Sequence, residues 1–234
     1  MKHFFTIAAL FASLIAFGQK KIVWFDTGIK IQYGAAGLYN AAISDSKIYD
    51  HEIGRGLSFG GKIGVNFNFG GFTLDVMKSS LNQGFEFQPD LTMNPKINWD
   101  ALDIYLLYRN AKNLGYFEIG PKLSLIQKVT YDKVTDEQTE HFNSNTLGGV
   151  IGFGANIMGN DGRFSGILGL RFEYGFTDFV KENTNDSEYP LPLIYTEGYK
   201  PSNIAFAGVV FELNWGIGYF GKAQCGARSK FIMF

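Results

Sequence analysis

Residues 57–69 read LSFGGKIGVNFNF, and their polarity changes at every second position. Apolar residues occupy one side of an extended chain, beginning with Leu57 and Phe59, while glycines and polar residues such as Lys62 occupy the other. Because successive side chains of a β-strand point to opposite faces, this alternation predicts a strand with one apolar and one polar face. The pair Gly70-Gly71 follows directly and predicts a tight hairpin turn.

The same period of two recurs along the rest of the chain and predicts eight strands. They are expected at 24–39, 57–69, from 72, 99–108, from 116, 147–157, 164–176 and 207–217. Short connections are expected at 70–71, 109–115 and 159–163, and long ones at 40–56, 79–98, 132–146 and 178–203. Short turns at one end and long loops at the other are the plan of an all-β, eight-stranded antiparallel up-and-down transmembrane β-barrel.

The composition of the 234 residues excludes several classes of protein. Hydrophobic residues make up 46% and charged residues 18%, which excludes a disordered chain. A formal net charge of −1 gives no basis for binding nucleic acid. The single cysteine, Cys225, excludes an intramolecular disulfide, and the sequence predicts neither a metal site nor a cofactor.

The N-terminus has the pattern of an export signal. Lys2 precedes an apolar run that ends at Ala16-Phe17-Gly18, with small residues at the two positions that signal peptidase reads. We expect residues 1–18 to be a cleaved signal peptide rather than a membrane anchor. Residues 19–234 then form the barrel domain of the cell outer membrane, with strands over roughly 22–220. Residues 221–234 are either a tail or a closing segment.

Alternation alone does not say which face of the barrel meets lipid. The alternative is a soluble, lipocalin-type lipid carrier with its apolar face inside. Glycines crowd the polar face beside charges, as a narrow interior requires. Aromatic residues also gather at strand ends, and those at the loop end are expected to face the membrane interface. That loop-end group comprises Tyr39, Trp99, Tyr131, Phe176 and Phe179. These features favour the membrane barrel.

Charged residues of the polar faces fall at similar depths and are expected to meet inside the barrel. The set is Lys30, Lys62, Asp103, Lys122, Arg171, Glu173 and Glu212, with Asp75 and Glu118 nearer the short turns. Ions away from bulk water must pair, so we expect a salt-bridge network that fills the lumen, and Glu212 paired with Lys30 or Arg171. A gated ion path is the alternative.

Residues suited to acyl-transfer chemistry occur in two long loops. His51 lies in Asp50-His51-Glu52 after Ser44 and Ser46, and His141 follows Glu140 before Ser144. Histidine with serine and a carboxylate is a pattern of hydrolases and acyltransferases, but polar loops also contain these types by chance. The sequence therefore favours a non-enzymatic protein, with a lipid acyl hydrolase or acyltransferase as an alternative.

The longest loop contains a group of aromatic and apolar residues next to two prolines. They are Tyr189, Leu191, Leu193, Tyr195 and Tyr199. Exposed aromatic residues on a rigid loop predict a contact surface for an envelope protein, and local packing over the barrel mouth is the alternative.

With its signal peptide, its alternating segments and its unequal loops, the chain resembles the small outer-membrane β-barrel family that includes PorT-like proteins. More distantly it is similar to the OmpA and OmpX type. The resemblance spans roughly residues 22–220. It implies an integral outer-membrane protein surrounded by outer-membrane lipid, with a structural or partner-binding role, and it brings no catalytic residues with it.

Overall fold

The computed structural model describes residues 23–45, 49–67, 70–87, 96–112, 115–131, 139–159, 163–181, 200–222 and 229–233. The expected signal peptide lies outside these ranges. The described elements are β1 (Val23–Tyr39), α2 (Ala41–Asp45), β2 (Tyr49–Glu52), β3 (Gly54–Phe67), β4 (Gly70–Phe87), β5 (Lys96–Lys112), β6 (Gly115–Tyr131), η2 (Thr139–His141), β7 (Asn145–Met158), β8 (Phe164–Gly175), β9 (Asn203–Lys222) and β10 (Ser229–Met233). No helix in this part of the chain is long and apolar enough to cross a membrane.

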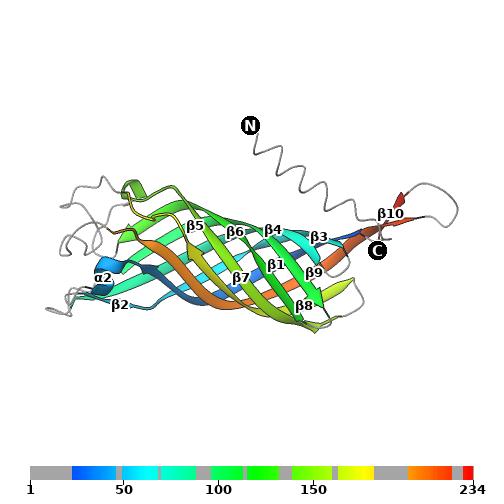
Figure 1. Ribbon diagram of the computed structural model, residues 1–234, viewed down its shortest axis with the longest axis horizontal. Helices are drawn as coiled ribbons and strands as arrows, with labels where there is room; N and C mark the ends of the chain where they lie inside the picture. Colours follow the sequence, from blue (N-terminus) through cyan, green and yellow to red (C-terminus); the bar gives the residue numbers. More distant parts are fainter. Residues whose placement is uncertain are drawn as a thin grey trace.

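Eight strands close into a ring in which every neighbour is antiparallel. The order is β1-β3-β4-β5-β6-β7-β8-β9, and β9 pairs with β1 from Val23↔Phe220 to Tyr39↔Asn203. Strands joined by residues 68–69, 113–114 and 159–163 turn at one end, and α2 and β2 lie at the other end (Figure 1). The predicted eight-stranded up-and-down barrel is therefore confirmed.

The two short strands outside the ring extend it at opposite ends. β2 pairs with the last residues of β4, from Tyr49↔Phe87 to Glu52↔Gly84, at the loop end. β10 folds back on β9 at the turn end, from Ser229↔Lys222 to Met233↔Gly218 (Figure 1). The strand that closes the barrel is thus β9, and residues 229–233 pair with its far end.

The outer surface of the ring is apolar and the inner surface is charged. Ile63 and Ile29 are 58% and 54% exposed, whereas Lys62 and Lys30 beside them are 4% and 2% exposed. A soluble barrel would bury its apolar side chains inside, so the soluble-carrier alternative does not fit. This is the distribution of a transmembrane barrel, with lipid against the apolar face.

One long connection is shorter than the alternation indicates. β4 continues to Phe87 and β5 begins at Lys96, although residues 79–98 were expected to form a loop. Along this part of β4 the outward side chains are polar, as at Lys78 and Ser80, and Leu81 points inward. The polarity of the faces has reversed because the barrel here extends beyond lipid into water.

That extension encloses an apolar core at the loop end, which we call the apolar cap. Its members are Ala36, Leu38, Ile43, Leu81, Phe85, Ile97, Trp99, Ala101, Ile126, Val129, Phe142, Phe179, Val180, Ile204 and Phe206. The Trp99 and Phe179 rings, with centroids 5.4 Å apart, lie inside it. The expectation that these two face the membrane interface is wrong, whereas Tyr39 and Phe176 are 52% and 68% exposed.

Candidate functional site

The seven predicted lumen residues all lie on the inner face of the barrel. Lys30 comes from β1, Lys62 from β3, Asp103 from β5, Lys122 from β6, Arg171 and Glu173 from β8, and Glu212 from β9. Each is at most 7% exposed. The period of two places them there, because each strand gives alternate side chains to the lumen. Together with Asp26, Asp75, Arg109 and Glu118, they form what we call the lumen network.

Glu212 is bound by three cations. Its Oε1 lies 2.7 Å from Nζ of Lys62 and 2.8 Å from Nη1 of Arg109, and its Oε2 lies 3.1 Å from Nζ of Lys30. Nη2 of Arg109 also donates to Oε2 at 2.8 Å, so the guanidinium binds the carboxylate with two parallel hydrogen bonds. Lys62 additionally contacts Asp26 at 3.2 Å.

Arg171 is held by other carboxylates. Its Nη2 lies 2.6 Å from Oε1 of Glu118 and 3.3 Å from Oδ2 of Asp75, which also binds Lys30 at 2.5 Å. On β9 the residue opposite Arg171 is Gly208, and the residue opposite Glu212 on β8 is Ile167. This register offset explains why Glu212 meets Lys30 and not Arg171.

A third group of ions lies toward the loop end. Nζ of Lys122 lies 2.6 Å from Glu173 and 3.0 Å from Asp103. The hydroxyl of Tyr105 donates to Glu173 at 3.2 Å, and its ring lies 5.0 Å from the Arg171 guanidinium. Gln32 donates to Glu173 and accepts from Arg171, so it joins this group to the rest of the network.

Arg109 is the main participant that the sequence reading missed. It lies in the predicted turn 109–115, and Leu107 interrupts the polar face of the strand before that turn. In the structure β5 runs on to Lys112, and Asp103, Tyr105, Leu107 and Arg109 all point inward. Because these four residues are spaced two apart, their positions in the sequence already indicate that Arg109 continues the inward face of the strand. Leu107 packs inside the lumen with Met77, Tyr105 and Val150.

The lumen network and the apolar cap close the barrel in two successive layers. The network occupies the middle of the strands, and the cap lies between it and the loop end. In the cap the Phe142 and Phe179 rings, 4.7 Å between centroids, come from chain segments outside the ring strands. Any ion crossing the lumen would meet paired charges and then an apolar core. The sequence reading anticipated only the charged layer.

Ser44 and His51 approach one another at the loop end, outside the apolar belt. Nε2 of His51 lies 3.4 Å from Oγ of Ser44, and Nδ1 lies 3.5 Å from Nε2 of Gln83. The backbone N–H of Leu38 donates to Oε1 of Gln83 at 2.6 Å, which fixes the orientation of that amide. The amide nitrogen of Gln83 also donates to the backbone oxygens of Glu52 and Gly84, each at 3.1 Å.

The geometry does not present Ser44 to His51 as a proton donor. A general base must accept the serine proton. Ser44 donates its own proton to the backbone oxygen of Asn40 at 3.2 Å. Partial burial lowers the pKa of His51, which keeps the ring neutral near pH 7.

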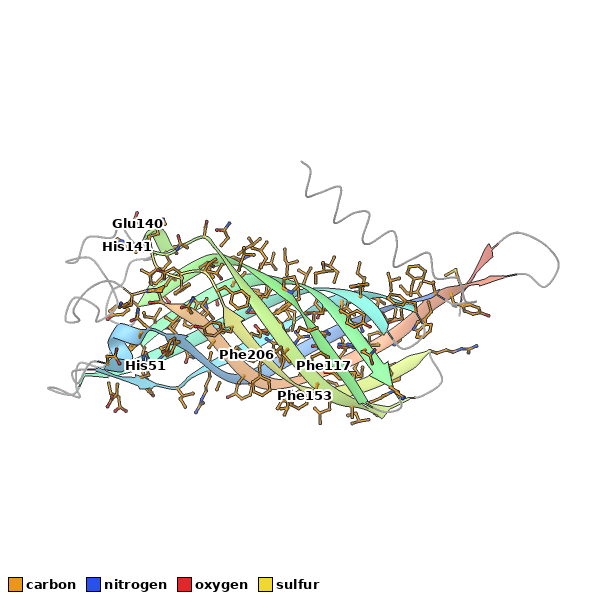
Figure 2. The ribbon with its side chains drawn as sticks, viewed as in Figure 1. His51, Phe117, Glu140, His141, Phe153 and Phe206 are labelled. Atoms are coloured by element: carbon orange, nitrogen blue, oxygen red, sulfur yellow. The ribbon has the colours of Figure 1, made fainter. Side chains whose placement is uncertain are left out.

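The second histidine lies elsewhere on the loop end. His141 and Glu140 are on η2, with Nε2 of His141 3.8 Å from Oε1 of Glu140, and Figure 2 shows them on the opposite side from His51. The described residues contain no group of three or more histidine, cysteine or acidic side chains placed to hold a metal ion. Ser46, Cys225 and the predicted contact residues Tyr189, Leu191, Leu193, Tyr195 and Tyr199 lie outside the described ranges.

Comparison with known proteins gives structural likenesses only. No protein-family model matches the chain. No curated protein matches its sequence. Among solved structures it is similar to Neisserial surface protein A, with 12% identity, a TM-score of 0.42, and coverage of 80% of this chain and 95% of that one.

Two further structures are similar over most of their length. One is Ail of Yersinia pestis, solved with the heparin analogue sucrose octasulfate, with 16% identity, a TM-score of 0.37, and coverage of 81% of this chain and 99% of Ail. The other is the translocator domain of the autotransporter NalP from Neisseria meningitidis, with 8% identity, a TM-score of 0.30, and coverage of 92% and 94%. At these values the likenesses carry no argument about function, and the fold rests on the strand pairing itself.

Proposed function

We propose that this chain is an integral outer-membrane barrel that works as a closed scaffold and presents an interaction surface on its loops. One observation carries the proposal: the lumen is filled by two different kinds of packing, paired ions and an apolar core. A channel needs a continuous polar path, and an eight-stranded interior is only wide enough for side chains. Lys30 and Arg171 are almost completely buried within it.

Planar-bilayer recording tests the closed state. The wild-type barrel should show no steady conductance, and Phe142→Ala with Phe179→Ala should stay silent because the lumen network still closes the barrel. A general-diffusion porin recorded in the same bilayer shows that the assay detects channels. Steady conductance of the wild-type barrel would contradict the proposal and favour a channel.

The interaction role is assigned to the longest loop, between β8 and β9. Its aromatic residues belong to a segment that joins two neighbouring strands of the barrel. Loops held by such a scaffold commonly carry binding residues. Affinity purification from native membranes in mild detergent should recover a stoichiometric envelope protein with the wild-type chain. The variant Tyr189→Ser, Leu191→Ser, Tyr195→Ser should lose it while keeping the folded-barrel gel mobility. Equal recovery with both chains would reject this loop.

The lipid acyl hydrolase or acyltransferase is the second candidate, favoured only by the proximity of Ser44 and His51. The hydrogen bond that Ser44 donates to the backbone oxygen of Asn40 argues against it. Wild-type barrel in vesicles containing labelled outer-membrane lipid should release no acyl chain above the level of Ser44→Ala. Release that disappears in Ser44→Ala would establish the enzyme instead.

A further inference from the structure

Outward charges on the barrel strands are confined to one side. All those that the structure describes belong to β3–β6: Arg55, Lys78, Glu86, Lys96, Asp100, Lys112 and Lys128. The charged side chains described on β1, β8 and β9 point into the lumen, and β7 carries no charged residue. Toward the loop end, outward positions on those strands carry residues such as Ala207, Tyr174 and Leu147.

Three exposed basic side chains lie where this outer face passes from apolar to polar, and we call Arg55, Lys78 and Lys128 the basic face. Lys78 stands opposite Phe59 on β3 and opposite Leu102 on β5, so its base lies within the apolar belt. A lysine in this position lays its stem along apolar neighbours and extends its ammonium toward the lipid headgroups.

The other two members lie nearer the loop end: Arg55 is on β3, next to β4, and Lys128 is on β6, with β5 between β4 and β6. The backbone N–H of Arg55 donates to Oδ1 of Asn82 on β4 at 3.0 Å. Lys128 stands opposite Asp100, which is the one acidic residue within the group. No described carboxylate pairs with the side chains of Arg55 or Lys78, so the face carries a net positive charge at headgroup depth.

We propose that the basic face binds the phosphate of a phosphorylated glycolipid of the lipid A type in the outer leaflet. The inference rests on the proposed outer-membrane location, because that leaflet adjoins the loop end of such a barrel. Charge complementarity selects the occupant: ammonium and guanidinium groups recognise phosphate oxygens, and the apolar residues below them suit acyl chains. Each uncompensated basic group near an anionic membrane surface strengthens binding about fivefold, so Arg55 and Lys78 together give roughly 25-fold.

The test uses the full barrel in phosphatidylcholine nanodiscs that contain a minor fraction of lipid A, with retained lipid counted by native mass spectrometry. Wild type should retain lipid A, and Arg55→Gln, Lys78→Gln, Lys128→Gln should retain at least tenfold less. The matched control Lys112→Gln, Lys181→Gln, Lys200→Gln removes the same charge from exposed positions elsewhere and should stay within twofold of wild type. If the triple variant fails to fold, Lys78→Gln alone should still weaken retention about fivefold.

The proposal would be overturned by equal retention of lipid A by the basic-face variant and the control variant. It would also be overturned if the wild-type barrel retained dephosphorylated lipid A or phosphatidylglycerol as well as it retains lipid A. Preferential binding of a soluble sulfated oligosaccharide over lipid A would also overturn it. If the barrel retains lipid A in nanodiscs but fractionates with another membrane, only the proposed outer-membrane location is contradicted. If the barrel fractionates with the outer membrane but shows no preference for lipid A, only the basic-face proposal is contradicted.

Discussion

At the residue scale, the lumen is governed by the need of each buried ion for a partner. Glu212 contacts Lys30, Lys62 and Arg109 from three different strands, so one carboxylate links β1, β3 and β5 to β9. A buried pair adds little net stability over apolar packing, but loss of one member leaves the others poorly solvated. The network therefore joins four strands across the lumen while adding little net stability of its own.

Glu212→Gln should lower the free energy of unfolding by about 3–5 kcal/mol, because three cations lose their shared anion. Urea unfolding in lipid vesicles, followed by tryptophan fluorescence, measures the change. Combining it with Lys62→Met should recover part of the loss. The exposed Glu86→Gln serves as the control and should change stability by less than about 0.5 kcal/mol. A Glu212→Gln barrel as stable as wild type would show that its contacts are not formed.

His51 should make the loop end sensitive to acid. Burial lowers its pKa in the folded protein below the ordinary value of 6.5, so the unfolded chain binds more protons as the pH falls. Neutral His51 therefore contributes its full stability above the pKa that it has in the unfolded chain. This contribution is lost as the pH falls through its pKa in the folded protein. Amide exchange of β2, corrected for intrinsic rates, should therefore be faster at pH 5 than at pH 7.

His51→Gln removes the titrating group and should abolish this difference, while amides in the middle of β7 serve as an internal reference. An equal pH response in wild type and His51→Gln would assign the effect to another group.

At the element scale, alternation predicts the strands correctly where their outer face meets lipid. It misses the parts of strands whose outer face meets water. β4 keeps its strand pairing as far as Phe87 although its outward residues turn polar at Lys78. Its last residues are stabilised by β2 and by the apolar cap, which contains Leu81 and Phe85. Alternation predicts that the strand ends at residue 78. That position is the edge of the lipid-facing belt, and the strand itself continues to Phe87.

Adjacent glycines of β3 should respond oppositely to the same substitution. A Cβ at Gly60 would press on the carbonyl oxygen of Val76 and come within 2.6 Å of Cα of Met77, whereas at Gly61 its nearest contact is the Gly28 oxygen at 3.6 Å. Gly60→Ala should cost about 1–3 kcal/mol through overpacking, and Gly61→Ala should be neutral or slightly stabilising. Denaturant midpoints in vesicles measure both. Equal costs would mean that the β3–β4 register differs from Gly60↔Met77.

At the scale of the whole molecule, closure of β1 with β9 removes every free edge from the ring. Such a closed ring with an apolar exterior satisfies its backbone hydrogen bonds internally, as a membrane requires. The lumen network and the apolar cap fill the space that this ring encloses.

Export with cleavage after Gly18 stays a prediction, and intact mass tests it. The protein isolated from outer membranes should begin at Gln19, with or without cyclisation of that residue. Its gel mobility should change on heating, because folded barrels resist detergent at room temperature. Recovery from the soluble periplasm would contradict the location, and a mass that includes residues 1–18 would contradict cleavage alone.

The sequence by itself determined the strand number, the antiparallel ring and the inward face of each strand. These depend on a local rule, since a strand between lipid and a packed interior must alternate polarity. Leu57–Phe67, apart from Gly61, and Leu168–Phe176 follow it. The same rule predicts that the seven charged residues of the lumen face inward.

Only the tertiary structure decided which ions meet. Partners across the lumen depend on the register around the ring, which places Gly208 opposite Arg171 and brings Arg109 to Glu212. The register shift at Asp100/Ala101 and the apolar cap likewise have no period-two signature. Alternation specifies which face of a strand a residue occupies. Contacts inside a closed barrel join residues that are distant in sequence, and the stagger of the strands and the packing of their side chains determine which residues meet.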